Sequence, residues 1–126
     1  MEGPHKNLRV WQESMVLVSE IYKETGTFPK SEMFGLINQL RRAVVSIPSN
    51  IAEGYGRSTD VDLLRFLYNA LGSSNEIDTQ LLIAYNIGYL EENAYEFLST
   101  HNETINKMLK SLIFKRKGDF RITEKP

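Results

Sequence analysis

The chain has 126 residues, of which 41% are hydrophobic and 25% are charged, as is typical of one globular domain. It contains no cysteine, which excludes disulfides, thiolate catalysis and cysteine-ligated metal sites. No apolar run is long enough to span a bilayer and no signal pattern opens the chain, so we expect a single cytoplasmic domain over residues 1–126 with no membrane partner.

The formal net charge of −1 is unevenly distributed. Residues 1–106 hold 8 Lys and Arg against 14 Asp and Glu, whereas residues 107–126 hold 7 against 2. A basic segment of this kind favours an acidic partner or nucleic acid. Alternatively, it is the solvated end of a helix, where the helix dipole favours cations. The acidic remainder of the domain would repel phosphate groups.

The first helix is predicted over residues 7–25. Its apolar residues recur in steps of three and four along one stripe, which comprises Leu8, Trp11, Met15, Val18 and Tyr22. Residues 26–29 end this helix, and Pro29 suits the first turn of the next one. Residues 1–6 show no periodicity and are expected to be frayed.

The second helix is predicted over residues 29–54, with an apolar stripe of Met33, Leu36, Leu40, Val44, Ile47 and Ile51. Pro48 lies inside this pattern and leaves two alternatives. The helix stops and restarts, with Asn50 and Glu53 as a capping pair, or it continues with a kink. Ile47 and Ile51 keep the helical phase, which favours the kink. Gly54 and Gly56 are expected to end the helix in left-handed conformations.

Two further helices are predicted over residues 59–86 and 91–117. Thr59, followed by Asp62, resembles an N-terminal cap. The stripe of the third helix is Leu63, Leu67, Leu71, Ser74, Leu81 and Tyr85, and that of the fourth is Ala94, Leu98, His101, Ile105, Met108 and Leu112. Residues 119–126 are expected to be frayed. Four helices with short connections predict an all-α, up-down-up-down antiparallel four-helix bundle.

A row of polar residues lies opposite the apolar stripe of the second helix. This polar row comprises Gln39, Arg42, Ser46, Ser49, Asn50, Glu53 and Arg57. It is either a solvent face or an interface with a subunit or ligand. The third helix contributes Gly72, Ser73 and Glu76 to the candidate set. A glycine inside a helix costs about 1 kcal/mol, and a closely packed partner would explain its presence. The alternative is local tolerance of one poor helix former. These ten residues are the candidate interface.

Catalysis is not expected from this chain. The only Glu-x-x-His spacing, which helix-bundle metal sites use, joins Glu2 to His5 near the N-terminus. His101 lies within the stripe of the fourth helix, where a hydrogen-bonded core or interface role is commoner than metal ligation. No phosphate-binding glycine loop is present, since the glycines around Tyr55 lack the lysine that such loops need. We therefore expect no catalytic residue, metal, cofactor or small-molecule substrate.

Several motifs resemble the family of four-helix bundle proteins encoded within intervening sequences of 23S ribosomal RNA. The wider family includes the accessory protein of diversity-generating retroelements. The resemblance covers about residues 8–113. The motifs that carry it are Val10-Trp11-Gln12, Ile21-Tyr22, Phe28-Pro29, Gly35-Leu36, Gln39-Leu40-Arg41-Arg42-Ala43, Ser46-Ile47-Pro48, Asn50-Ile51-Ala52-Glu53-Gly54, Arg57, Arg65-Phe66-Leu67, Ala70, Gly72-Ser73, Glu76, Gln80-Leu81 and Gly88-Tyr89.

The resemblance implies a kinked bundle that assembles into a ring-shaped homopentamer and has no defining enzymatic activity. It leaves two hypotheses. The first is a non-catalytic assembly or adaptor protein that works as a homo-oligomer. The second is an RNA-binding protein whose basic residues converge on one rim of a ring, as the strongly basic retroelement relatives imply. The basic candidates are Arg42, Arg57, Lys110, Lys115, Arg116 and Lys117.

Overall fold

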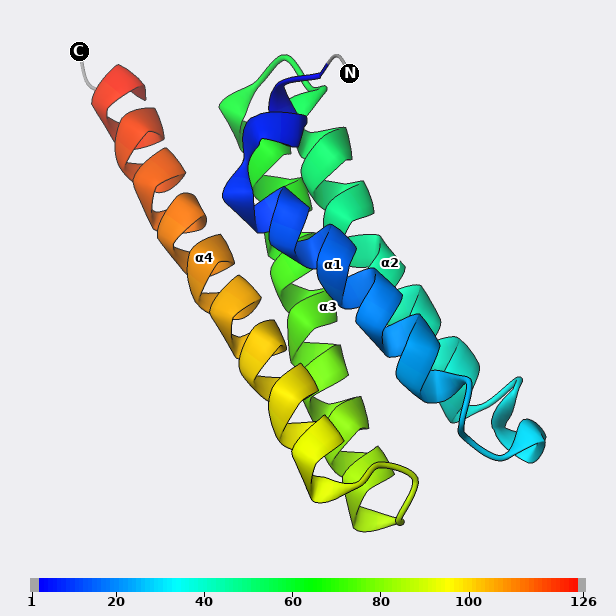
Figure 1. Ribbon diagram of the computed structural model, residues 1–126. Coiled ribbons are helices and arrows are strands. Elements are labelled where there is room, and N and C mark those ends of the chain that lie inside the picture. The colour runs from blue at the N-terminus through cyan, green and yellow to red at the C-terminus, as the bar shows by residue number, and fades with distance from the viewer. Residues whose placement is uncertain (1–2, 125–126) are drawn as a thin grey trace.

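The computed structural model describes residues 3–124, with side chains described for residues 3–118. Its elements are the short 3₁₀ helices η1 (Pro4–Asn7) and η2 (Lys30–Glu32) and the α-helices α1 (Arg9–Thr25), α2 (Leu36–Tyr55), α3 (Asp60–Asn86) and α4 (Glu92–Glu124). No strand occurs in this part of the chain. The predicted all-α, four-helix fold is confirmed. In Figure 1 the chain reverses direction at each connection between successive α-helices.

Several predicted bounds are wrong. Residues 4–7 form a 3₁₀ turn rather than a frayed end. Helix α2 begins at Leu36 instead of residue 29, because the Glu32 carboxylate accepts a hydrogen bond from the Leu36 amide at 3.1 Å and caps the helix there. Helix α4 continues to Glu124 instead of ending near residue 117, since an interior glycine such as Gly118 weakens a helix without ending it. The predicted fraying at residues 1–2 and 125–126 lies outside the described residues.

Helix α2 runs unbroken through Pro48, so the alternative in which it stops and restarts is wrong. Ile47 and Ile51 are both fully buried, which shows that the helical phase is kept across the proline. A kink at Pro48 stays a prediction.

The predicted left-handed glycines at the end of α2 are also wrong. Gly56 is right-handed at φ −87°, and Gly54 lies within the helix. A side chain at Gly54 would place its Cβ 3.0 Å from both Leu63 Cδ1 and Phe66 Cβ. Gly54 is therefore needed because α3 approaches α2 closely at this point.

Helix α1 buries a different face from its predicted stripe. The buried residues are Val10, Ser14, Leu17, Ile21 and Thr25. Ser14 and Thr25 read as polar in the sequence. Inside the bundle, however, the Ser14 hydroxyl donates to the Trp11 carbonyl at 2.8 Å and that of Thr25 to the Ile21 carbonyl at 2.7 Å. Because each hydroxyl is satisfied by its own helix, the core accepts it.

The predicted stripes of the second and third helices are largely buried, whereas in that of the fourth helix Leu98 and Ile105 are buried and the other residues are half-buried. Met33 and Tyr85 are exceptions and lie exposed. Thr59 caps α3 as predicted, accepting a hydrogen bond from the Asp62 amide at 3.2 Å. Between α3 and α4 the core is polar at one level, where the Ser74 hydroxyl donates to Asn102 Oδ1 and Asn102 Nδ2 donates to the Ser74 carbonyl, both at 3.0 Å. These paired bonds fix how the two helices align.

Candidate interaction surfaces

Four residues of the predicted stripe of α1, namely Trp11, Met15, Val18 and Tyr22, line an apolar surface together with α2. Two neighbouring hollows, of about 610 and 370 Å³, lie along the two helices and share Val45 and Ser49. We call them together the α1–α2 surface. Its apolar lining comprises Trp11, Met15, Val18, Tyr22, Met33, Ile37, Val45, Pro48 and Ala52.

Several of these lining side chains are exposed, whereas Ile37 and Pro48 are buried at the base of the hollows. Met15 is 44% exposed, Tyr22 is 42% exposed and Val45 is 39% exposed. The inner stripe of α1 already supplies its share of the bundle core. Helix α1 therefore carries a second apolar stripe, in which Leu8, Trp11 and Val18 are half-buried against the core and Met15 and Tyr22 are exposed.

A second groove lies between α2 and α3 and has a volume of about 420 Å³. This α2–α3 groove is lined by Asn38, Gln39, Arg42, Ala43, Ser46, Ser73, Glu76 and Gln80, of which five belong to the candidate interface. The Ser46 hydroxyl donates to that of Ser73, which ties the two helices together within the groove. Gln80 Oε1 is buried and has no hydrogen-bond partner within the described part of the chain.

The remaining candidate interface residues lie elsewhere. Ser49 lines both hollows of the α1–α2 surface. Asn50 Nδ2 donates back to the Ser46 carbonyl at 2.7 Å. Glu53 and Arg57 form an exposed ion pair at 2.6 Å near the end of α2. Gly72 is exposed, and a Cβ added there would meet no neighbouring element within 4 Å, so the described part of the chain provides no close packing partner for it.

The six basic candidates are distributed over several surfaces of the chain. Arg42 lies in the α2–α3 groove, Lys110 in a polar groove between α3 and α4, and Lys115 beside α1. The other three lie against aromatic rings. The distance from the charged group to the ring centroid is 4.9 Å for Arg57 and Phe66, 5.5 Å for Arg116 and Tyr55, and 5.7 Å for Lys117 and Tyr68.

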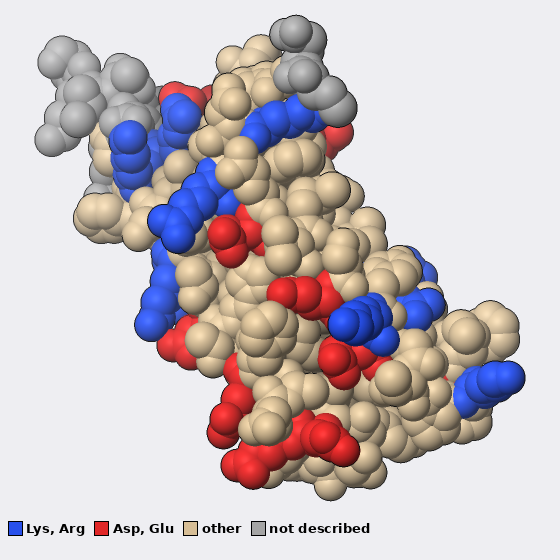
Figure 2. All heavy atoms as spheres, viewed as in Figure 1, with Lys and Arg blue, Asp and Glu red and all other residues tan. Residues whose placement is uncertain are grey.

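Charge is separated along the bundle. Figure 2 shows acidic side chains gathered where α3 joins α4, and basic side chains along the C-terminal half of α4. The exposed acidic residues at that turn include Glu91, Glu92 and Glu96. The uneven charge of the sequence therefore becomes two poles of different sign in the folded chain.

His101 bridges α4 to α1 through two glutamates. Its Nδ1 lies 2.6 Å from Glu20 Oε1 and its Nε2 lies 2.8 Å from Glu13 Oε1. Both nitrogens can donate only when the ring is a protonated imidazolium. The sequence pointed to a hydrogen-bonded role for His101 but not to its partners. Glutamates spaced seven residues apart on one face of α1 are the signal that could have indicated them.

Two other surface features were missed by sequence reasoning. The exposure of Val45 beside α1 depends on which stripe of α1 is buried, which the pattern alone does not decide. The groove around Met108 and Lys115 depends on where α4 lies relative to the start of α1. Within the described residues, no cluster of three or more His, Cys, Asp or Glu side chains is arranged to hold a metal ion, and no helix combines the length and apolarity needed to cross a membrane.

Comparisons with known proteins agree with the all-α fold of the chain. The family model described as "23S rRNA-intervening sequence protein" matches residues 6–111. The chain belongs to this family. It is similar to the crystal structure of a protein with unknown function from the S23 ribosomal protein family of Bacteroides thetaiotaomicron VPI-5482, at 27% identity and a TM-score of 0.75. That match covers 82% of this chain and 97% of the other. No curated protein sequence matches the chain.

Proposed function

We propose that this member of the family is a non-catalytic assembly or adaptor protein that works as a homo-oligomer, and that its subunits meet at the α1–α2 surface. The observation that carries the proposal is the outward stripe of α1, in which Met15 and Tyr22 are more than two-fifths exposed. Contiguous apolar surface of this kind marks interaction sites on soluble proteins. A second copy of the chain would bury it.

The surroundings of the α1–α2 surface also suit a subunit contact. Arg42 and Ser46 line both the α1–α2 surface and the α2–α3 groove, so the apolar area is continuous with a polar one. An apolar centre with a polar rim is the usual anatomy of an interface between subunits. Gly72 on α3 is exposed and a Cβ added there would meet no neighbouring element within 4 Å in the described part of the chain, which leaves room for another chain to pack there. The resemblance to ring-forming relatives supports five subunits.

Native mass spectrometry tests this proposal directly. We expect a mass near five times the 14.5 kDa of the chain. Val45→Glu places a charge where the two hollows meet and should dissociate the assembly, while costing the monomer little because Val45 is partly exposed. Phe114→Glu is the matched control, since Phe114 is 81% exposed and lines neither hollow. A wild-type monomer, or equal effects of the two variants, would reject the proposal.

RNA binding is a second candidate function, and one observation favours it. At the end of the bundle where α4 passes the end of α2, Arg116 and Lys117 lie beside the rings of Tyr55 and Tyr68. Cations interleaved with aromatic rings suit a nucleic acid, because phosphates meet the charges and bases stack on the rings. An RNA titration should show affinity that falls as salt rises and that Arg116→Glu and Lys117→Glu reduce. Affinity insensitive to salt or to both variants would remove this candidate.

A further inference from the structure

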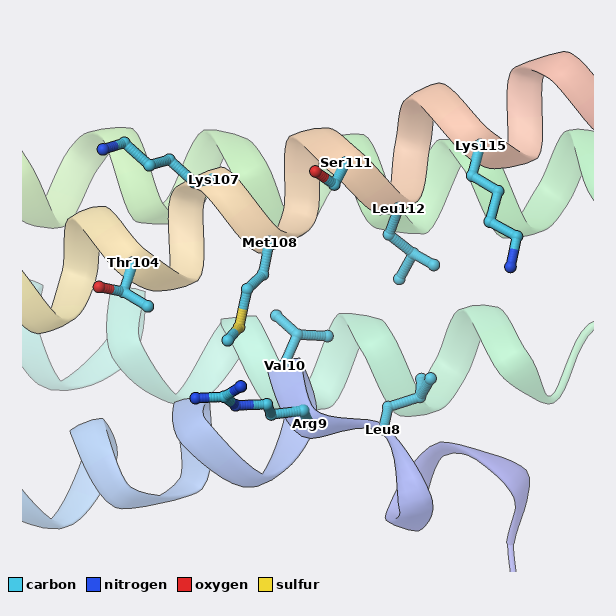
Figure 3. A pocket seen from close by; sticks show the side chains of 9 residues that line it. All are labelled: Leu8, Arg9, Val10, Thr104, Lys107, Met108, Ser111, Leu112 and Lys115. Carbon is cyan, nitrogen blue, oxygen red and sulfur yellow. The ribbon is translucent and has the colours of Figure 1, made fainter.

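A groove of about 530 Å³ lies between the start of α1 and the second half of α4 (Figure 3). We call it the cationic groove. Its lining comprises Leu8, Arg9, Val10, Thr104, Lys107, Met108, Ser111, Leu112 and Lys115. In Figure 3 the side chains of Met108 and Leu112 point from α4 toward Leu8 and Val10. The groove therefore has an apolar floor contributed by both helices.

Positive charge flanks this floor on both sides. Lys107 and Lys115 lie two turns apart on α4, with Ser111 between them, and Arg9 lies on α1. Lys107 also pairs with Glu103 at 3.1 Å, but both groups are well exposed and such a pair contributes little. Helix α1 begins at the groove without a side-chain cap and without an acidic residue in its first turn. The amide groups of its first turn add to the positive potential.

We propose that the cationic groove binds an acidic amphipathic helix of a partner protein. The chemistry of the lining calls for an apolar stripe flanked by carboxylates, and an amphipathic helix presents these together. The groove is open to solvent along one side, so its occupant needs a polar outer face. A fatty acid lacks such a face, and RNA has no apolar stripe to cover the floor.

The dimensions of the groove agree with a helical occupant. Its lining on α4 extends from Thr104 to Lys115, which corresponds to about 16 Å at 1.5 Å per residue. That length matches about three turns of a partner helix. Carboxylates seven or eight residues apart on the partner would face Lys107 and Lys115 together. This inference goes beyond subunit assembly, because the groove shares no lining residue with the α1–α2 surface.

The test is fluorescence anisotropy on the full chain with a labelled peptide of about 16 residues, long enough to form a helix on binding. The peptide carries a leucine stripe at helical spacing flanked by glutamates. We expect saturable binding that weakens as salt rises. The double variant Lys107→Glu with Lys115→Glu should weaken binding by about tenfold or more, since it reverses two facing charges. Leu112→Ser should also weaken peptide binding, because it removes apolar area from the floor of the groove.

Matched controls separate this site from general charge attraction. Lys110→Glu makes the same charge change on the same helix, but Lys110 lines the groove between α3 and α4. It should leave the affinity within about twofold of wild type, as expected for a residue outside the contact. A scrambled peptide of equal composition without the leucine stripe should bind weakly. Equal binding of the scrambled peptide, or an equal loss with Lys110→Glu, would overturn the proposal.

Other occupants have distinguishable outcomes. Saturable binding of sodium oleate or of a single-stranded RNA, lost in the double variant while the helical peptide fails to bind, would assign the groove to that ligand and overturn the proposal. Native mass spectrometry of the double variant should show the wild-type oligomer. Dissociation there would show instead that a second copy of the chain covers the groove. Val45→Glu tests subunit assembly and does not alter the cationic groove. If the assembly proposal fails, the peptide-binding experiment still tests the groove.

Discussion

The contact between α2 and α3 and the contact between α1 and α4 are built on different principles. The first depends on shape: Gly54 admits Leu63 and Phe66 at a distance where any larger residue would crowd them. The second includes a polar bridge, in which His101 lies within hydrogen-bond distance of Glu13 and Glu20. Figure 1 shows the C-terminal half of α4 passing the start of α1 at one end of the bundle. The cationic groove lies at that end.

This difference indicates which parts of the molecule are free to serve a partner. Close-packed seams transmit strain and tolerate little change of volume. A seam held by a polar bridge at one level can leave its other end open without loss of the core, because the apolar residues of α4 still pack against α3. We therefore expect changes between α2 and α3 to act on stability and changes in the cationic groove to act on binding.

The largest expected effect compares one substitution in the core with the same substitution in the groove. Leu67 is fully buried, whereas Leu112 is half-buried at the groove floor. Leu67→Ala should lower the free energy of unfolding by about 2–5 kcal/mol, and Leu112→Ala by about 1 kcal/mol or less, because its site can be refilled by water. Urea unfolding followed by circular dichroism, at one protein concentration for all variants, measures both. Equal losses of stability in the two variants would show that the core and the cationic groove do not differ in this respect.

The bridge at His101 should come next in size. His101→Ala removes the partly exposed contacts of the ring with Glu13 and Glu20 and leaves two carboxylates facing each other, so we expect a loss of about 1–2 kcal/mol. Glu103→Gln breaks the exposed pair with Lys107 and should cost less than about 0.5 kcal/mol. A double-mutant cycle with Glu20→Gln isolates the coupling. A coupling energy near zero would mean that the contact between His101 and Glu20 does not contribute to stability.

The two helical glycines offer a smaller contrast. Gly54→Ala gains helix propensity worth about 1 kcal/mol but forces a Cβ against Phe66 Cβ, and overpacking of this kind costs about 1–3 kcal/mol, so the net change should be a loss near 1 kcal/mol. Gly72→Ala meets open space and should stabilise the isolated chain by about 0.5–1 kcal/mol. If Gly72 packs against a second copy, the same variant should weaken the oligomer in native mass spectrometry.

The sequence predicts the four helices well because hydrophobic periodicity over many residues averages out local exceptions. The third and fourth helices begin at residues 60 and 92, one residue from the predicted starts. The family follows from the motif block around Pro48. The start of α2 was misplaced because its cap, Glu32, acts from a 3₁₀ turn that no helical pattern marks.

The candidate surfaces were harder to predict, since they depend on tertiary choices that one helix does not encode. Helix α1 has an inner stripe containing Ser14 and Thr25 and an outer stripe containing Met15 and Tyr22. By composition the outer stripe is the more apolar. The inner one can be buried because its hydroxyls bond to their own backbone and Val10, Leu17 and Ile21 pack in the core. The partners of His101 and the cationic groove depend in the same way on how α4 lies across α1.

The smallest expected effect concerns a hydrogen bond between two connecting segments of the chain. The Tyr89 hydroxyl donates to Glu32 Oε2 at 2.9 Å and joins the α3–α4 connection to η2. The hydrogen bond to Glu32 is the main cause that raises the pKa of Tyr89 above its ordinary 10.0, followed by desolvation and the nearby carboxylate charge. A raised pKa in the fold means that the bond is fully present below pH 10 and is lost as the pH rises through the folded value. Absorbance titration of wild type should therefore contain one tyrosine that ionises late, and Tyr89→Phe should remove it with little change in stability below pH 10. A late-ionising tyrosine that persists in Tyr89→Phe would show that the hydrogen bond between Tyr89 and Glu32 is absent in solution.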